Sequence, residues 1–173
     1  MSGIRVRSRK DLKHQRRRRS HSCWDHLLIA PLWPMYDVNL GTLLRTCDAV
    51  GACLAVPKLP WVPDALAKGN TLRRRTCVHW TGHDQVRWLI DQRARPDTTV
   101  IGVELADEAI RLGDLPAARN RTVAVLGHER TGIPPEAVDQ LDLVVEIPMI
   151  GTGASLNVAV AGSLVLYRLA GLL

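Results

Sequence analysis

The chain has 173 residues, of which 46% are hydrophobic and 23% are charged. This length is typical of one domain, so large multidomain machinery is excluded, and the apolar content excludes a largely disordered chain. The net positive charge comes from one end of the chain. The first 30 residues hold nine of the 23 Lys and Arg and two acids, a net charge of +7, whereas the rest of the chain carries a net charge of −1.

Short apolar runs alternate with amphipathic stretches along the chain. In chain order we expect a strand over 26–32, a helix over 39–50 with Asn39 as a candidate N-cap, a strand over 52–56, a turn-rich segment over 57–63, a strand over 77–80, a helix over 83–95, strands over 98–105, 121–126 and 143–147, and a helix over 155–171. This alternation favours an α/β fold, a parallel sheet flanked by helices. Ligands of such sheets bind beyond the carboxyl ends of the strands.

The basic end predicts an N-terminal arm over residues 1–25, ahead of one domain over residues 26–173. Such an arm favours a polyanion, because each neutralised phosphate releases condensed counterions. RNA, DNA and an acidic membrane surface fit this charge, and so does a solvated tail that binds nothing. We expect a cytoplasmic protein with no membrane partner, because no signal peptide is visible and the apolar stretch 154–173 is interrupted by Arg168.

The four cysteines include no C-x-x-C pair, and without a secretory signal they are expected to be reduced thiols. Two local clusters contain potential zinc ligands, H-x-C-x-x-H over 21–26 and C-x-H-x-x-x-H over 77–83. Neither cluster has the paired spacing that is typical of a zinc finger. The sequence therefore predicts no metal site.

Three segments rich in glycine and polar residues follow expected strands. They are NLGTLLR from Asn39 to Arg45, VLGHERTGI over 125–133, and IPMIGTGASLNV over 147–158. Each segment alone is a weak signal, and the G-x-G at 151–153 lacks the third glycine and the downstream acid of a dinucleotide fingerprint. No Walker loop is present in the sequence either, which argues against a generic nucleotide-binding protein.

Together and in this order, the three segments resemble the signature motifs of the SpoU or TrmH branch of the SPOUT RNA methyltransferases. The resemblance covers roughly residues 26–171, and its most specific part is the P-M-x-G-x-x-x-S-L-N-V run over 148–158. It implies methyl transfer from S-adenosylmethionine to a ribose 2'-hydroxyl of tRNA or rRNA, carried out by a homodimer. It also implies a SPOUT-type fold whose C-terminal part is threaded as a trefoil knot.

The resemblance also implies the site residues. The catalytic residues would be Asn39, Arg45, Glu129, Ser155 and Asn157. The cofactor would contact Gly127, Ile147, Met149 and Leu156, with the loop after the strand at 103–105 lining the same pocket. The alternative is a non-catalytic RNA-binding module that retains the fold. Loss of Arg45, Glu129 or Asn157 would indicate that module, and all three are present.

Arg45 has two possible roles. The family assigns its arginine as the proton acceptor, although a guanidinium holds its proton in proteins. A dry, positively charged site could lower its pKa. Alternatively, Arg45 binds the substrate phosphate bidentately and the phosphate or a water accepts the proton, which is the role we favour. Asn39 and Glu129 would position Arg45 and the ribose, while Ser155 and Asn157 would hydrogen-bond the cofactor loop.

The helix expected over 155–171 is apolar on both of its faces. A helix that is apolar all round must be buried on both sides. A second copy of the chain is the cover that we expect, with the small residues at 161–163 allowing close approach. Another helix of the same chain is the alternative cover.

Overall fold

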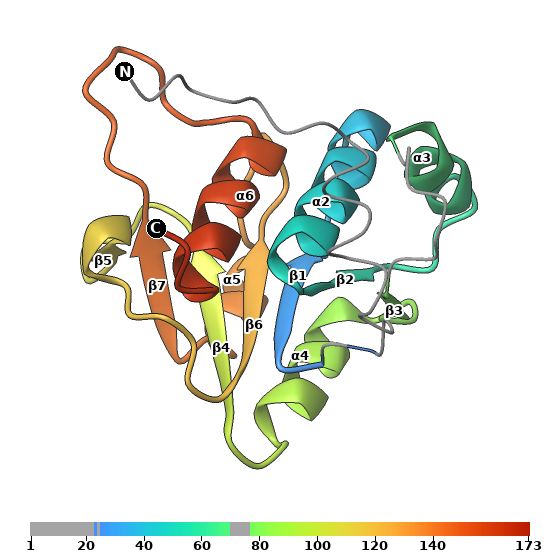
Figure 1. Ribbon diagram of the computed structural model, residues 1–173, viewed down its shortest axis with the longest axis horizontal. Coiled ribbons are helices and arrows are strands. Elements are labelled where there is room, and N and C mark those ends of the chain that lie inside the picture. The colour runs from blue at the N-terminus through green and yellow to red at the C-terminus, as the bar shows by residue number, and fades with distance from the viewer. Residues whose placement is uncertain (1–22, 24, 70–76) are drawn as a thin grey trace, which may run out of the picture.

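The computed structural model describes residue 23 and residues 25–69 and 77–173. Arm residues 1–22 lie outside the described residues, so the expected binding of a polyanion by the arm stays a prediction. Seven strands form one sheet in the order β3-β2-β1-β6-β4-β7-β5, and every neighbouring pair is parallel (Figure 1). The predicted parallel α/β sheet is confirmed.

The secondary structure follows the predicted alternation. The strands are β1 (Leu27–Pro31), β2 (Cys53–Val56), β3 (Val78–Trp80), β4 (Thr98–Val103), β5 (Ile110–Arg111), β6 (Arg121–Leu126) and β7 (Leu143–Glu146). The helices are α2 (Asp37–Val50), α3 (Val62–Gly69), α4 (Gln85–Arg93), α5 (Pro135–Val138) and α6 (Val158–Leu169), with a 3-10 turn η1 (Leu112–Asp114). Each predicted strand agrees with the observed bounds within two residues.

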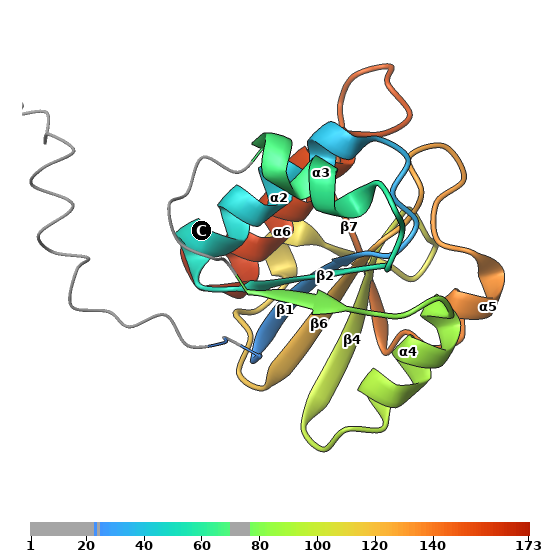
Figure 2. The ribbon, with the colours of Figure 1, turned by 90° about the vertical axis from the view of Figure 1, so that its right-hand side faces the viewer.

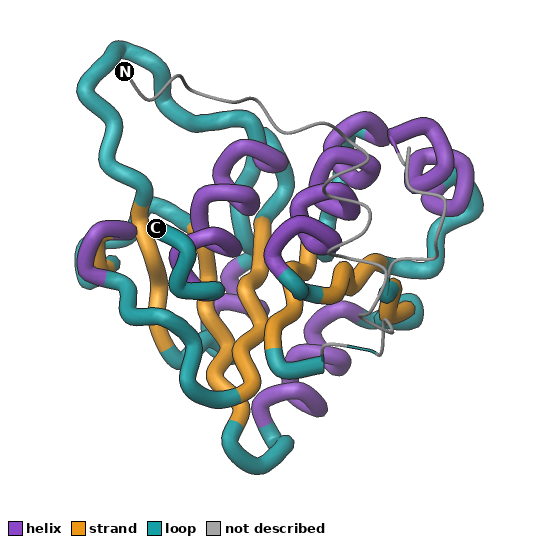
Figure 3. Tube along the Cα trace, viewed as in Figure 1, coloured by secondary structure: helices purple, strands orange, loops and turns teal. Residues whose placement is uncertain are grey.

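Helices cover both faces of the sheet, so the protein has three layers (Figures 2 and 3). Helices α2, α3 and α6 pack on one face, and α4 and α5 pack on the other. Successive side chains of β1 point to opposite faces of the sheet. Leu27 and Ile29 belong to the core beneath α2, α3 and α6, while Leu28 and Ala30 belong to the core beneath α4 and α5. A strand buried on both faces must be apolar throughout, which explains why the central strands are continuous apolar runs.

Helix α2 begins at Asp37, two residues before the predicted start. The expectation that Asn39 is its N-cap is wrong, because Tyr36 occupies the cap position and Asn39 lies within the helix, 2% exposed. The end of the helix was predicted correctly: Gly51 adopts φ 77°, and its N–H donates to the Cys47 carbonyl at 3.0 Å. Glycine is favoured at such a left-handed C-terminal position because it has no Cβ.

Helix α3 was not predicted from the sequence, which indicated a turn-rich segment over 57–63 and no element over 64–76. Pro63 lies in its first turn, where the amide that proline lacks has no helical partner to lose. Helix α6 begins at Val158 instead of residue 155, with the Asn157 side chain accepting from the N–H groups of Ala159 and Val160 at 2.9 and 3.2 Å.

The small residues of α6 serve packing within the chain. A Cβ on Gly162 would come within 2.7 Å of Leu43 in α2 and 2.8 Å of Leu126 in β6. The hydroxyls of Ser163 and Thr46 lie 2.8 Å apart, which joins α6 to α2 directly. One face of α6 is therefore covered by the sheet and by α2 of the same chain, while Val160 stays 48% exposed on another side. Within the described residues, no helix has the length and apolarity needed to cross a membrane.

Candidate active site

A cavity of about 530 Å³ opens where strands β4, β6 and β7 end. This is the carboxyl edge of the sheet, where ligands of α/β proteins bind, and the volume is typical of a small-molecule site. Its lining includes all four residues expected to contact a cofactor, Gly127, Ile147, Met149 and Leu156. Glu129 and Ser155 line it as well, so six of the nine expected site residues share one cavity.

A chain of side-chain hydrogen bonds joins one residue from each of the three motifs. The Asn157 amide Nδ2 donates to Asn39 Oδ1 at 3.0 Å, and Asn39 Nδ2 donates to Glu129 Oε1 at 3.0 Å. These residues lie 118 and 90 positions apart in the sequence. Because Asn39 is buried, its amide orientation is fixed by having one donor and one acceptor on opposite sides.

Glu129 also holds the beginning of α2. Its Oε2 accepts from the backbone N–H of Met35 at 2.9 Å, and its Oε1 accepts from that of Tyr36 at 3.3 Å. A carboxylate near a helix N-terminus is favourable because it meets free N–H groups and the positive end of the helix dipole. Glu129 thus supplies, from a distant loop, the cap that the sequence around α2 lacks.

A second carboxylate lies in the first turn of the same helix. Lys68 of α3 donates to Asp37 Oδ2 at 2.7 Å, and this hydrogen bond and the lysine charge lower the pKa of Asp37. Both side chains are largely exposed, so the pair adds little stability. Its effect is to keep a negative charge at the positive end of α2.

The loop after β6 is a tight hairpin across the mouth of the cavity. His128 and Gly132 exchange backbone hydrogen bonds of 2.9 Å in both directions. The close return leaves no room at Gly127, where a Cβ would lie 2.3 Å from the Gly132 carbonyl carbon. The backbone at Gly127 can therefore take this path only without a side chain.

Glu104 fixes the same hairpin from β4. Its Oε2 accepts from the Ile133 N–H at 3.1 Å, and a Cβ on Gly132 would lie 2.2 Å from that oxygen. The loop at 103–105 was expected to line the pocket, but Glu104 was not among the expected site residues. The sequence signal that could have identified Glu104 is a lone acidic residue directly after a buried strand, at the edge where ligands bind.

Arg45 is separated from the other expected catalytic residues. It lies on the exposed side of α2, six residues beyond Asn39, which is about 9 Å along a helix axis. Within the described part of the chain, Arg45 does not line the cavity. Ser155 does line it, from the exposed loop 147–157 that leads from β7 to α6.

His128 has a local structural contact. Its ring Nδ1 accepts from the backbone N–H of Arg130 at 3.2 Å, within the hairpin tip. The ring therefore stabilises the turn that carries Glu129.

The chain is similar to proteins of one family. A model described as the SpoU rRNA Methylase family matches residues 27–167. A tRNA (guanosine(18)-2'-O)-methyltransferase of Mus musculus is 36% identical over 138 residues, covering 75% of this chain and 8% of that protein. The Escherichia coli (strain K12) protein of the same description is 33% identical over 135 residues, covering 75% of this chain and 56% of that protein. The chain thus spans about half, or much less, of these curated relatives.

A solved structure shares the fold. The crystal structure of an AdoMet-bound rRNA methyltransferase from Sinorhizobium meliloti matches with a TM-score of 0.68 at 21% sequence identity. The match covers 94% of this chain and 69% of that chain. At this level of identity the match shows the fold.

Proposed function

Because the chain belongs to the SpoU rRNA methylase family, we propose that it is an RNA 2'-O-ribose methyltransferase that uses S-adenosylmethionine. The observation that carries this proposal is the hydrogen-bonded chain from Asn157 through Asn39 to Glu129 beside the cavity. A residue that acts only as a helix cap or in a surface pair does not need hydrogen-bond partners from two other motifs, as Asn39 has. Three motifs that meet through hydrogen bonds to the buried Asn39 fit a site whose geometry must be held closely.

The residues around the cavity fit the cofactor. S-adenosylmethionine supplies an electrophilic methyl group when it is bound. Ile147 and Leu156 offer apolar surface suited to an adenine, and the hairpin that begins at Gly127 brings backbone groups to the cavity mouth. Met149, 36% exposed, extends the apolar rim.

The chain's own polar groups position the substrate. A ribose 2'-hydroxyl is a weak nucleophile, so its attack requires close positioning and a route for its proton. Asn39 and Glu129 hold the start of α2 against the hairpin, and Ser155 faces the same cavity. We assign Arg45 to the substrate phosphate, because a guanidinium binds phosphate bidentately and keeps its own proton.

The position of Arg45 requires a second copy of the chain in this proposal. Since Arg45 does not line the cavity of its own chain, it would reach the cavity of a partner in a homodimer. Exposed apolar side chains support such a contact: Tyr36 is 45%, Val38 63% and Val160 48% exposed. They lie at the beginnings of α2 and α6, which the Asn39 to Asn157 hydrogen bond holds together.

The trefoil knot is also part of this proposal. Strand β7 lies between β4 and β5 near one edge of the sheet, whereas α6 packs back against α2, β1 and β6. Residues 147–157 must therefore cross the carboxyl edge of the sheet, which supports threading of the C-terminal segment. A crystal structure that traces residues 120–173 without a break would test it.

The experiment that tests the activity is methylation of two RNA pools in separate reactions, one of unmodified tRNA and one of rRNA, with S-adenosylmethionine labelled in its methyl group. We expect labelled 2'-O-methylnucleosides by mass spectrometry of the digested RNA, and the relatives' descriptions favour tRNA. An Asn157→Ala variant should lose this product. RNA binding with no methylation in either pool would support the non-catalytic module instead.

A further inference from the structure

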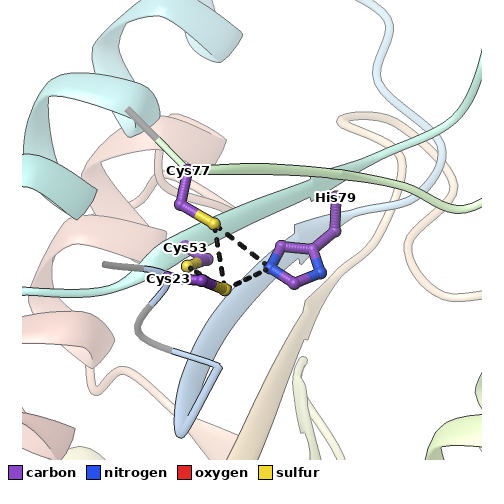
Figure 4. A group of neighbouring side chains, drawn as sticks. All are labelled: Cys23, Cys53, Cys77 and His79. Atoms are coloured by element: carbon purple, nitrogen blue, oxygen red, sulfur yellow. Dashed lines mark hydrogen bonds between the residues drawn. The ribbon is translucent and has the colours of Figure 1, made fainter. Parts of the chain in front are cut away.

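Three cysteines and a histidine meet at the β2–β3 edge of the sheet, outside the residues that line the cavity (Figure 4). Cys53 is the first residue of β2, Cys77 directly precedes β3, and His79 lies within β3. Cys23 comes from the segment before β1. The three Sγ atoms and one imidazole nitrogen turn toward one another, all within 4.8 Å.

The distances between these atoms match the edges of a metal-centred tetrahedron. Zinc binds thiolates at about 2.3 Å and imidazole at about 2.0 Å, so a tetrahedral site has S···S edges of about 3.8 Å and S···N edges of about 3.6 Å. Cys23 Sγ lies 3.7 Å from Cys53 Sγ and 3.2 Å from Cys77 Sγ. The imidazole Nε2 of His79 lies 3.3 Å from both Cys23 Sγ and Cys77 Sγ. These four distances are shorter than the ideal edges by up to about 0.6 Å, so a small outward shift of the ligand atoms around an ion would complete the geometry.

The chemistry of the four ligands selects the metal. Three thiolates and one imidazole are the Cys₃His set of structural zinc sites, and soft sulfur ligands disfavour Mg²⁺ and Ca²⁺. Because the protein already supplies four ligands, no position is left for a substrate, as in a closed structural site.

We propose that Cys23, Cys53, Cys77 and His79 bind one structural Zn²⁺ ion. This proposal replaces the prediction of no metal from sequence. Each local cluster contributed only part of the set, and Cys53, which belonged to neither, completes it. The ion would join Cys23, which precedes β1 in the chain, to β2 and to the edge strand β3.

The site also has a consequence for the basic parts of the chain. In the sequence, the nine Lys and Arg residues of the arm precede Cys23, and the run Arg73–Arg75 ends two positions before Cys77. Zinc would fix Cys23 and Cys77, which follow these two basic segments in the sequence, near one edge of the sheet.

The test begins with the full-length protein purified without chelators or a metal-binding tag. We expect about one equivalent of zinc per chain by elemental analysis. Replacement by Co²⁺ should give the visible and near-ultraviolet absorption of a tetrahedral thiolate site. Removal of zinc with a chelator should lower Tm, because an ion that binds only the folded chain stabilises it.

Variants distinguish these ligands from other thiols. Cys77→Ala and His79→Ala should each bind zinc at least roughly tenfold more weakly. Cys47→Ala is the matched control, since Cys47 is buried in α2 outside the cluster and should leave one equivalent bound. If the two variants fail to fold, the Co²⁺ spectrum of the unmodified protein still decides the question.

Two results would overturn the proposal. One is a folded protein with no zinc, no cobalt thiolate absorption and no change of Tm with chelator. The other is a disulfide between Cys23 and Cys77 in protein kept under reducing conditions that maintain other thiols, which mass spectrometry after alkylation would reveal.

Discussion

Asn39→Asp is the most informative substitution in the hydrogen-bonded chain at the site. Asn39 Nδ2 donates to Glu129 Oε1 at 3.0 Å, and Asn39 is 2% exposed. The substitution keeps the size of the side chain but replaces the donor with a carboxylate oxygen. Two carboxylates would then face each other at about 3 Å with little water between them.

The expected cost follows from two competing energies. Like charges about 3 Å apart at an effective dielectric constant near 20 repel by about 5 to 6 kcal/mol. Binding a proton at pH 7 by a carboxyl group with a normal pKa near 3.9 costs about 4 kcal/mol. The smaller cost prevails, so we expect Asn39→Asp to lower the free energy of unfolding by about 4 kcal/mol at pH 7.

The sign of the pH dependence follows from the same proton. The pair binds a proton in the folded chain at a pH where the unfolded chain has released it, so its pKa is raised by folding. The destabilisation is therefore about 4 kcal/mol at pH 7 and shrinks by about 1.4 kcal/mol per unit as the pH falls toward 4. A protonated carboxyl group can donate to Glu129 and accept from Asn157, as the native amide does.

Urea unfolding at pH 5 and pH 7 measures this effect as the difference in the free energy of unfolding between Asn39→Asp and the unsubstituted protein. Asn39→Ala is the control, because it removes the hydrogen bonds without adding charge and should cost about 1 to 3 kcal/mol equally at both pH values. Adding Glu129→Gln to Asn39→Asp should restore part of the stability at pH 7. An Asn39→Asp cost that is the same at both pH values, or no larger than that of Asn39→Ala, would refute the reasoning.

Four further predictions concern the proposed function. Gly127→Ala should abolish S-adenosylmethionine binding, measured by calorimetry, because the added Cβ would lie 2.3 Å from the Gly132 backbone. Gly153→Ala is the control and should leave binding intact, because a Cβ there would meet nothing within 4 Å. Equal effects of the two substitutions would contradict the steric argument. Arg45→Ala should abolish methyl transfer while cofactor affinity stays within roughly threefold, and retained turnover would remove Arg45 from the mechanism. Deleting residues 2–19 should weaken RNA binding and flatten its dependence on salt, and an unchanged salt slope would assign no RNA contact to the arm. Val160→Glu should change the mass measured by light scattering from that of a dimer to that of the 19.1 kDa monomer. Val160 is 48% exposed, so the glutamate should not prevent the single chain from folding. An unsubstituted protein that is already monomeric would refute the dimer.

The sequence by itself determined the class of fold and the place of the site. Continuous apolar runs such as that of β1 can be buried only between two layers of helices, so a parallel sheet follows from composition and alternation. The glycine-rich segments after β6 and β7 were expected at the carboxyl edge, and they line the cavity there. These features are local, because each depends on which residues follow one another along a strand or turn.

Tertiary structure decided which distant side chains meet. The sequence predicted Asn39 as a helix cap, but the cap at α2 comes from Glu129, 93 positions beyond Tyr36, and this left Asn39 free to join Glu129 to Asn157. The partner of Gly162 was likewise set by the tertiary structure. The small residues at 161–163 were expected to allow close approach of a second copy, but the missing side chain of Gly162 makes room for Leu43 and Leu126 of the same chain.

The cysteine cluster shows the physical reason most clearly. Cys23 and His79 are 56 positions apart, and no periodicity or spacing in the sequence relates them. They meet because β1, β2 and β3 are neighbours in the sheet, and the order of strands depends on how whole layers pack against one another. Sequence patterns record which side chains must be buried, whereas the partner of each buried group is set only when the complete chain has packed.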